Sequence, residues 1–148
     1  MNSLLSVTDA RERGYDEAIL LNSEGNISEG SGQNIFYIKN GTVHTNDKKS
    51  SILLGITRSS IIQLCKDQGI PVEVHSFDLE NLLVADEVFF TGTASEVTPI
   101  RSIEDNLISD GEPGEITLNL RESYMDIVYG RNSKYISWLS SANDKTTV

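Results

Sequence analysis

The segment Ile27–Phe36 constrains this chain more than any other part of its sequence. A carboxylate, Glu29, stands in the small-residue run Ser-Glu-Gly-Ser-Gly, and strand-forming residues lie on either side. The glycines at 30 and 32 permit positive φ angles or a close approach of the backbone to a flat ligand. Glu29 is therefore either a solvated residue of a hairpin or a fixed negative charge at the edge of a ligand site. The run is no dinucleotide-binding fingerprint, because its sixth position is Ile35 rather than glycine or alanine.

The composition is that of a globular protein of one domain. The chain has 148 residues, 38% of them hydrophobic and 23% charged. No apolar run is long enough to span a bilayer, and no basic segment of a signal peptide opens the chain, so no membrane contact is expected. A net charge of −10 without a basic stripe argues against nucleic acid as a partner. The single cysteine, Cys65, is expected in the core, and its lack of a disulfide partner favours a reducing, cytoplasmic location.

Hydrophobic periodicity predicts short strands and hairpins mixed with helices, which is typical of an α/β or α+β domain. Asn40-Gly41 is the signature of a type I′ hairpin turn. The last helix is expected to bury Leu120, Tyr124, Ile127 and Val128. The expected helices cover 2–13, 56–68, 78–83 and 116–128, and the expected strands cover 18–21 (buried), 27–39 (interrupted), 42–45, 72–77, 87–91 and 97–103. Residues 140–148 lack apolar periodicity and are expected to form a flexible tail.

The two histidines are expected to have ordinary structural roles. His44 falls in the second arm of a hairpin, where a surface or half-buried position is typical. His75 falls on the polar face of the strand over 72–77 and is expected to be solvated. We therefore predict no metal site.

Two segments have the features of anion sites. Gly55-Ile56-Thr57-Arg58 opens the clearest helix, whose free N–H groups and positive dipole end attract anions. Gly92-Thr93-Ala94 follows an apolar strand and can direct N–H groups and a hydroxyl at an oxyanion. Each segment also has a simpler interpretation, a Thr57 N-cap and an ordinary tight turn. Together with Glu29, they suit a ligand with a phosphate and a basic nitrogen, such as pyridoxal phosphate.

Four sequence blocks occur in the order found in a known family: Ser28-Glu29-Gly30-Ser31-Gly32 with Asn34; Gly55-Ile56-Thr57-Arg58; Asp86 to Ala94 followed by Glu96 to Ile100; and Gly130-Arg131-Asn132 with Lys134-Tyr135 and Trp138-Leu139. On these blocks the chain resembles the C-terminal domain of branched-chain amino-acid aminotransferases, which are fold type IV pyridoxal-phosphate enzymes. The likeness covers Leu4 to Leu139. It implies that residues 1–139 form the larger, cofactor-binding domain of such an enzyme, a pseudo-barrel of mixed, largely antiparallel strands with flanking helices.

The resemblance also implies roles for individual residues. Glu29 would pair with the pyridine nitrogen. The backbone amides of Ile56 and Thr57, with the Thr57 hydroxyl, would hold the phosphate. Thr93 would contribute to the phosphate site, and the Thr93 and Ala94 amides would face the substrate carboxylate.

The chain departs from the family pattern at several positions. Gln33 stands where the family usually has Glu, Leu54 replaces a usual Pro, and the loop over 46–49 differs. In the family the Schiff-base lysine lies upstream of the stretch that matches Met1, and none of this chain's lysines falls at that position. The smaller N-terminal domain is also absent. We therefore expect a domain fragment without a catalytic residue of its own, inactive alone and with weak or no affinity for the cofactor.

The resemblance predicts a parent enzyme that transfers the amino group of Leu, Ile or Val to 2-oxoglutarate. D-amino-acid aminotransferase and aminodeoxychorismate lyase, which share the fold, are the alternatives. A different alternative is a non-catalytic domain that binds cofactor or only associates. The expected partners are a small amino acid and a 2-oxo acid, the missing N-terminal domain, and further copies in a homo-oligomer.

Overall fold

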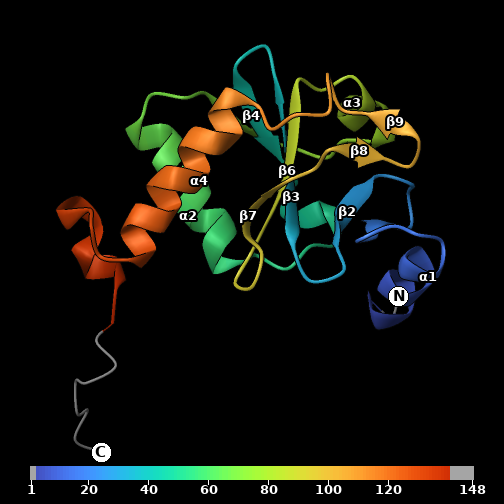
Figure 1. The fold of residues 1–148 in the computed structure, drawn as a ribbon, viewed down its shortest axis with the longest axis horizontal. Helices are drawn as coiled ribbons and strands as arrows, with labels where there is room; N and C mark the ends of the chain where they lie inside the picture. Colours follow the sequence, from blue (N-terminus) through green and yellow to red (C-terminus); the bar gives the residue numbers. More distant parts are fainter. Residues whose placement is uncertain (1–2, 141–148) are drawn as a thin grey trace, which may run out of the picture.

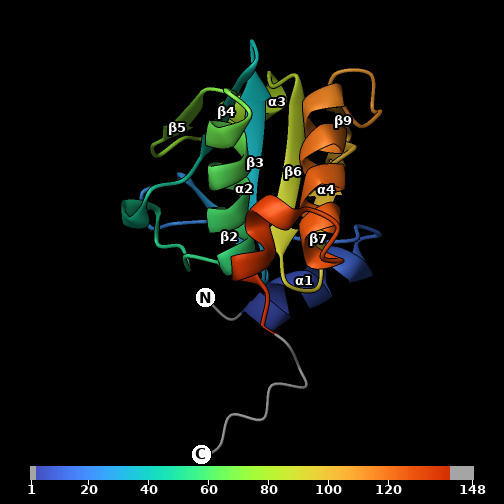
Figure 2. The same cartoon turned by 90° about the vertical axis from the view of Figure 1, so that its left-hand side faces the viewer.

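A five-stranded mixed sheet forms the centre of the computed structural model, which describes residues 3–140. Its strand order is β5-β4-β3-β6-β7, and only the β4–β5 pair is parallel. The bounds are β3 Asn34–Lys39, β4 Thr42–Thr45, β5 Val72–Val74, β6 Glu87–Gly92 and β7 Glu96–Pro99. Helices α2, Ile56–Asp67, and α4, Glu115–Val128, lie side by side over one face (Figure 2). The predicted fold, a largely antiparallel mixed sheet with flanking helices, is confirmed.

Smaller elements lie at the other side of the sheet (Figure 1). Strands β1, Ile19–Leu21, and β2, Ile27–Gly30, form one two-stranded ladder, and β8, Ser102–Ile103, and β9, Asn106–Leu107, form another. Helices α1, Ser3–Glu12, and α3, Leu79–Leu83, complete this side, and the 3₁₀ turns are η1, Lys48–Ser50, and η2, Ser133–Trp138. Asp78 caps α3 with a reciprocal capping box, as its sequence indicates.

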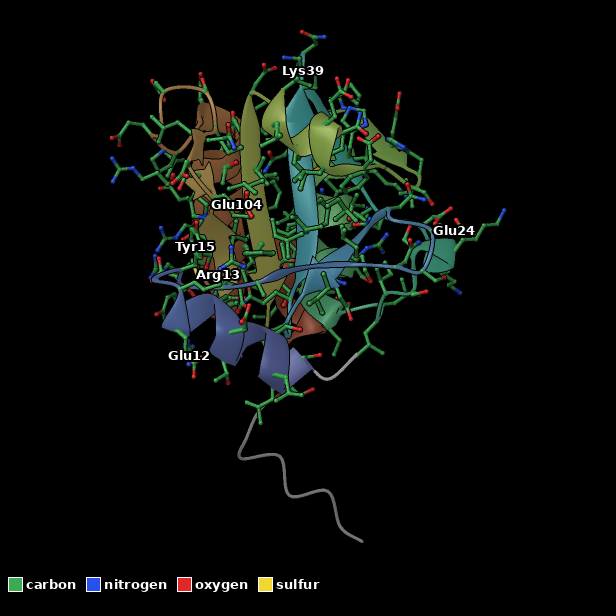
Figure 3. All side chains as sticks on the ribbon, turned by 90° about the vertical axis from the view of Figure 1, so that its right-hand side faces the viewer. Glu12, Arg13, Tyr15, Glu24, Lys39 and Glu104 are labelled. Atoms are coloured by element: carbon green, nitrogen blue, oxygen red, sulfur yellow. The ribbon has the colours of Figure 1, made fainter. Side chains whose placement is uncertain are left out.

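The β3–β4 hairpin fixes the register of the sheet. Asn40 and Gly41 both have positive φ angles, 50° and 74°, as the predicted type I′ turn requires. The turn pairs Lys39 with Thr42 and carries the register along to Phe36 and Thr45. Lys39 thereby lies at the end of β3 that is remote from α1 (Figure 3).

Alternating side chains of β3 and β6 build a hydrophobic core on each face of the sheet. Phe36 and Phe89 point toward α2 and α4, and their rings stack at a centroid distance of 4.9 Å. Ile35 and Phe90 point the other way, where they pack with Leu82 of α3. Complete burial of each such side chain contributes about 1.5–3 kcal/mol to the stability of the fold. Because β3 and β6 bury side chains on both faces, they favour an arrangement in which both faces of the sheet are covered. Cys65 lies in the first core, as predicted.

Several local predictions are wrong. The strand over 72–77 ends at Val74, and the strand over 97–103 is divided between β7 and β8. Leu21, expected in a buried strand, is 47% exposed, and Val128 is 44% exposed. Thr117, which was not expected in the core, is buried near the start of α4, where its backbone N–H donates to the Glu87 carboxylate at 2.7 Å.

No helix within residues 3–140 is long and apolar enough to cross a membrane. The predicted tail over 140–148 lies outside the described residues except for Ser140.

Candidate functional site

Three segments that are distant in the sequence line one hollow of about 220 Å³. Glu29 comes from β2, Ile56 and Thr57 from the first turn of α2, and Thr93 from the β6–β7 turn. Ala94, at the exposed tip of that turn, does not line the hollow. The remaining lining residues are Ser3, Ser31, Gly32, Gln33, Asn34, Leu53, Gly55, Thr91 and Gly92. The structure thus brings together four of the five predicted site residues.

Side chains of the Glu29 segment hold the chain that leads into α2. Asn34 Nδ2 donates to the carbonyl oxygen of Leu53 at 2.7 Å, and Asn34 Oδ1 accepts the Gly55 N–H at 3.2 Å. Glu29 Oε2 accepts the Leu53 N–H at 3.0 Å. The other carboxylate oxygen, Oε1, accepts no hydrogen bond from the rest of residues 3–140. Glu29 therefore positions this segment with one oxygen and has the other available to a ligand.

The start of α2 is suited to bind an anion. Gly55 is the N-cap residue, and no side chain caps the helix. The N–H groups of Ile56 and Thr57 belong to the first turn, where they have no partner within the helix, and the dipole adds positive potential. A Cβ atom at position 55 would lie 2.5 Å from Asn34 Oδ1, so a larger residue there would have to displace the Asn34 side chain.

The Thr57 hydroxyl has a partner for which the sequence holds no local signal. Thr57 is 3% exposed, and its Oγ1 lies 3.3 Å from Tyr124 Oη of α4. When Tyr124 donates in this contact, the Thr57 hydroxyl proton remains for an acceptor in the hollow. The contact also ties the start of α2 to the neighbouring helix.

The β6–β7 turn approaches the Glu29 segment closely at Gly92. A Cβ atom there would lie 2.8 Å from Ser95 Oγ and 3.3 Å from the carbonyl oxygen of Gly32. Thr91, which also lines the hollow, is 1% exposed, and its hydroxyl oxygen has no hydrogen-bond partner among the described residues. Buried hydroxyls normally have a partner, so Thr91 adds a donor for a bound group.

Arg58, next to the hollow in the first turn of α2, and Gln33, which lines it, each make a hydrogen bond to a distant segment. Arg58 is 6% exposed, and its Nη2 donates to the carbonyl oxygen of Asn46 at 2.7 Å. Burial lowers the pKa of the Arg58 guanidinium. Gln33 Nε2 donates to Glu17 Oε2 at 3.2 Å, a contact between distant segments that sequence reasoning missed. A buried guanidinium in the first turn of α2 adds to the positive potential at the helix start.

A second hollow of about 240 Å³ lies at residues 99–101 and 111–113. It contains none of the predicted site residues.

The family model for amino-transferase class IV matches residues 1–103. The chain belongs to this family. Within it, the chain is 48% identical to a probable branched-chain-amino-acid aminotransferase of Aquifex aeolicus over 98% of its length, and 40% identical to the branched-chain-amino-acid aminotransferase of Escherichia coli K12 over 97%. It covers only 47% and 46% of these two proteins, so it spans about half the length of the curated relatives it matches.

Solved structures of branched-chain amino acid aminotransferases match the fold of this chain. The branched-chain amino acid aminotransferase of Thermobaculum terrenum, in its PLP-bound holo-form, matches 93% of the chain with a TM-score of 0.90 at 41% identity. The Escherichia coli enzyme matches 97% of the chain with a TM-score of 0.92 at 40% identity. The chain covers 45% and 48% of these two structures. The resemblance to the branched-chain group inferred from the sequence blocks is confirmed.

Proposed function

We propose that this class IV aminotransferase chain is the cofactor-binding half of an enzyme that exchanges the amino group of Leu, Ile or Val with 2-oxoglutarate. One observation carries the proposal: Glu29, the start of α2 and the Thr93 turn line a single hollow. The names of the relatives support the branched-chain substrate class.

The residues of the hollow fit pyridoxal phosphate. The N–H groups of Ile56 and Thr57 and the hydroxyls of Thr91 and Thr93 would hold the phosphate at the helix start. The unengaged Oε1 of Glu29 would accept a hydrogen bond from the protonated pyridine nitrogen and keep it protonated. Each charge-assisted hydrogen bond contributes about 1.5–3 kcal/mol. When bound, the group supplies an electron sink for bond breaking at the substrate Cα.

The Thr93 turn would also receive the substrate carboxylate. Thr93 and Ala94 are both exposed at the end of the β6–β7 hairpin, beside the hollow. Their backbone N–H groups would donate to a carboxylate bound over the Thr93 side of the hollow.

The hollow forms one wall of a site, which the rest of the enzyme would complete. Its volume of about 220 Å³ is below the roughly 300–1,000 Å³ of a closed ligand pocket. Apolar side chains surround it, with Leu53 78% exposed and Ile56 85% exposed, and with Leu4 and Leu5 exposed in the neighbouring α1. Such a patch is typical of a surface that another domain or subunit covers. The N-terminal half of the enzyme is its proposed occupant.

Catalysis by the isolated chain is not expected. No lysine of residues 3–140 lines the hollow, and Lys39 lies at the end of β3 remote from α1, whose Ser3 lines the hollow (Figure 3). We infer that the lysine that carries the cofactor belongs to the part of the enzyme that precedes this chain. The chain incubated with pyridoxal phosphate and borohydride should yield no stoichiometric adduct by mass spectrometry. An adduct on one lysine would contradict this inference.

The substrate proposal is tested by joining the N-terminal half of the Aquifex aeolicus relative to this chain. We expect the fusion to transaminate L-leucine with 2-oxoglutarate and to lose this activity in the Glu29→Ala variant. A preference for D-alanine would instead favour a D-amino-acid aminotransferase. A fusion that binds cofactor but transfers no amino group would favour the non-catalytic alternative.

A further inference from the structure

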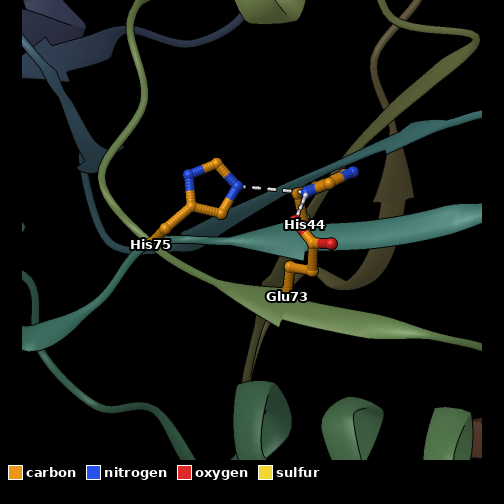
Figure 4. Close-up of side chains that lie close together, drawn as sticks. All are labelled: His44, Glu73 and His75. Carbon is orange, nitrogen blue, oxygen red and sulfur yellow. Dashed lines mark hydrogen bonds and ion pairs between the residues drawn. The ribbon is translucent and has the colours of Figure 1, made fainter.

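The only two histidines of the 148-residue sequence meet at the edge of the central sheet, together with a carboxylate. The parallel pairing of β4 with β5 sets His44 opposite Glu73, and His75 follows directly after β5. His44 Nδ1 lies 3.1 Å from His75 Nε2 and 3.5 Å from Glu73 Oε2 (Figure 4). One ligand-type atom from each residue falls within 4.8 Å of the other two.

The hydrogen bonds of His75 determine which of its nitrogens is available. His75 Nδ1 lies 2.9 Å from the carbonyl oxygen of Ser76, which can only accept. In a neutral ring this contact favours the proton on Nδ1, which leaves Nε2 with a lone pair on the side of His44. A metal bound to both rings then requires the tautomer of His44 with its proton on Nε2, so that Nδ1 is a ligand. A histidine that donates one ring N–H to a backbone carbonyl while offering the other nitrogen is the usual arrangement of a metal ligand.

Aromatic packing holds both imidazoles in place. The ring of His44 stacks on that of Tyr37 at 4.4 Å and 9°. The ring of His75 packs edge-on against Tyr37 at 6.4 Å and lies 5.9 Å from the ring of Phe77. Fixed rings lower the entropy that is lost when a ligand orders them.

We propose that His44 Nδ1, His75 Nε2 and the Glu73 carboxylate form a binding site for a divalent transition metal, with Zn²⁺ as the best match. Ligand atoms about 2.0–2.2 Å from a tetrahedral Zn²⁺ lie about 3.4 Å from one another. Two of the three separations, 3.1 and 3.5 Å, lie on either side of this value, and the three ligand atoms all fall within 4.8 Å of one another. Two imidazoles with one carboxylate favour Zn²⁺ over Mg²⁺ or Ca²⁺, which prefer oxygen ligands.

The fourth position of the metal belongs to water. The Glu73 side chain is 64% exposed, and β5 is an edge strand, so solvent reaches the cluster from outside. None of the three residues lines the cofactor hollow. The metal would link β4 to β5 and stabilise this edge, since a ligand that binds only the folded state raises its stability.

The test is isothermal titration of the full 148-residue chain with ZnCl₂, with MgCl₂ as the comparison ion. We expect saturable binding of one Zn²⁺ per chain and a rise in melting temperature, and neither effect with Mg²⁺. Replacing His75→Gln or Glu73→Gln should weaken Zn²⁺ binding on the order of 100-fold, at least the loss seen when outer-shell partners are removed. Glu80→Gln, an exposed residue of α3 with the same change in charge, should leave binding unchanged.

Glu73→Gln separates binding from folding, because this exposed side chain contributes little to packing, whereas His44 stacks on Tyr37. Circular dichroism checks that each variant is folded. The proposal is overturned if Zn²⁺ does not saturate at one per chain. It is equally overturned if the His75→Gln and Glu73→Gln variants bind Zn²⁺ as the parent chain does, since binding would then be by scattered surface carboxylates.

Discussion

Asn34 Oδ1 accepts the backbone N–H of Gly55 at 3.2 Å, and this contact ties the central strand β3 to the N-cap of α2. The same side chain donates to the carbonyl oxygen of Leu53 at 2.7 Å. Together with Glu29, which accepts the Leu53 N–H, this buried amide holds the segment that leads into the first turn of α2. The anion-binding property of that turn depends on this position, because N–H groups act on a ligand only at hydrogen-bond distance.

Replacing Asn34→Ala should lower the free energy of unfolding by about 1–3 kcal/mol, because it removes two hydrogen bonds, each of which contributes about 0.5–1.5 kcal/mol. Asn106→Ala is the control, since Asn106 is exposed and makes a single side-chain hydrogen bond at 3.4 Å. The control should change stability by less than about 0.5 kcal/mol. Urea unfolding followed by circular dichroism measures both. Equal losses in the two variants would contradict the role assigned to Asn34.

Gly92→Ala should destabilise the chain by about 1–3 kcal/mol, because a new methyl group must displace its neighbours. Ser95 Oγ can rotate away, but the carbonyl oxygen of Gly32, 3.3 Å from the new Cβ atom, belongs to the backbone. The matched variant is Gly32→Ala, whose Cβ atom would meet nothing within 4 Å. Thermal unfolding should show a clear loss for Gly92→Ala and almost none for Gly32→Ala. The reverse order would show that the two turns do not pack as described.

Asp67 should contribute stability that disappears in acid. A hydrogen bond from Tyr135 Oη at 2.5 Å, assisted by Lys134 and Gln63, lowers the pKa of the Asp67 carboxyl from 3.8 to about 2. Because the folded-state pKa is the lower one, the contribution is present above pH 3.8 and is lost as the pH falls through about 2. The difference in unfolding free energy between the parent chain and Asp67→Asn should therefore shrink over that interval. A difference that is constant across it would rule out the linkage.

The thiol of Cys65 should be inert in the folded chain. The side chain is 0% exposed, and burial raises its pKa to about 12. Ellman's reagent near pH 8 should therefore react only after unfolding, since the thiolate is the reactive form. Rapid reaction without denaturant would mean that the core beneath α2 opens easily.

Each wall of the hollow at Glu29 has a local sequence signal, and the resemblance to the aminotransferase family indicated that these walls meet. Each signal can be recognised from a few consecutive residues: the helix start after Gly55, the strand followed by Gly92-Thr93, and the carboxylate among glycines. The contacts that join these walls carry no such signal. Tyr124, for example, reaches Thr57 across 67 positions of sequence, and only the packing of α4 on α2 brings them together.

The histidine cluster was missed for the same reason. His44 and His75 are separated by 31 positions, and their meeting depends on the parallel β4–β5 pairing, which periodicity does not specify. His75, which was expected to be solvated, is instead half-buried, because its ring packs against Tyr37 and Phe77. The half-buried position expected for His44 is confirmed.

The start of α2, the Thr93 turn and Glu29 should together bind one phosphorylated pyridine. Titration of the ¹⁵N-labelled chain with pyridoxamine 5′-phosphate, observed by two-dimensional NMR, tests this binding directly, because this ligand forms no bond to a lysine. Because the hollow is only one wall of the site, we predict weak binding, with shifts in the backbone amides of Ile56, Thr57 and Thr93 that saturate at high ligand concentration. Pyridoxamine without its phosphate should not produce these shifts at the helix start. Shifts that cluster instead at the second hollow, around 99–101 and 111–113, would contradict the account.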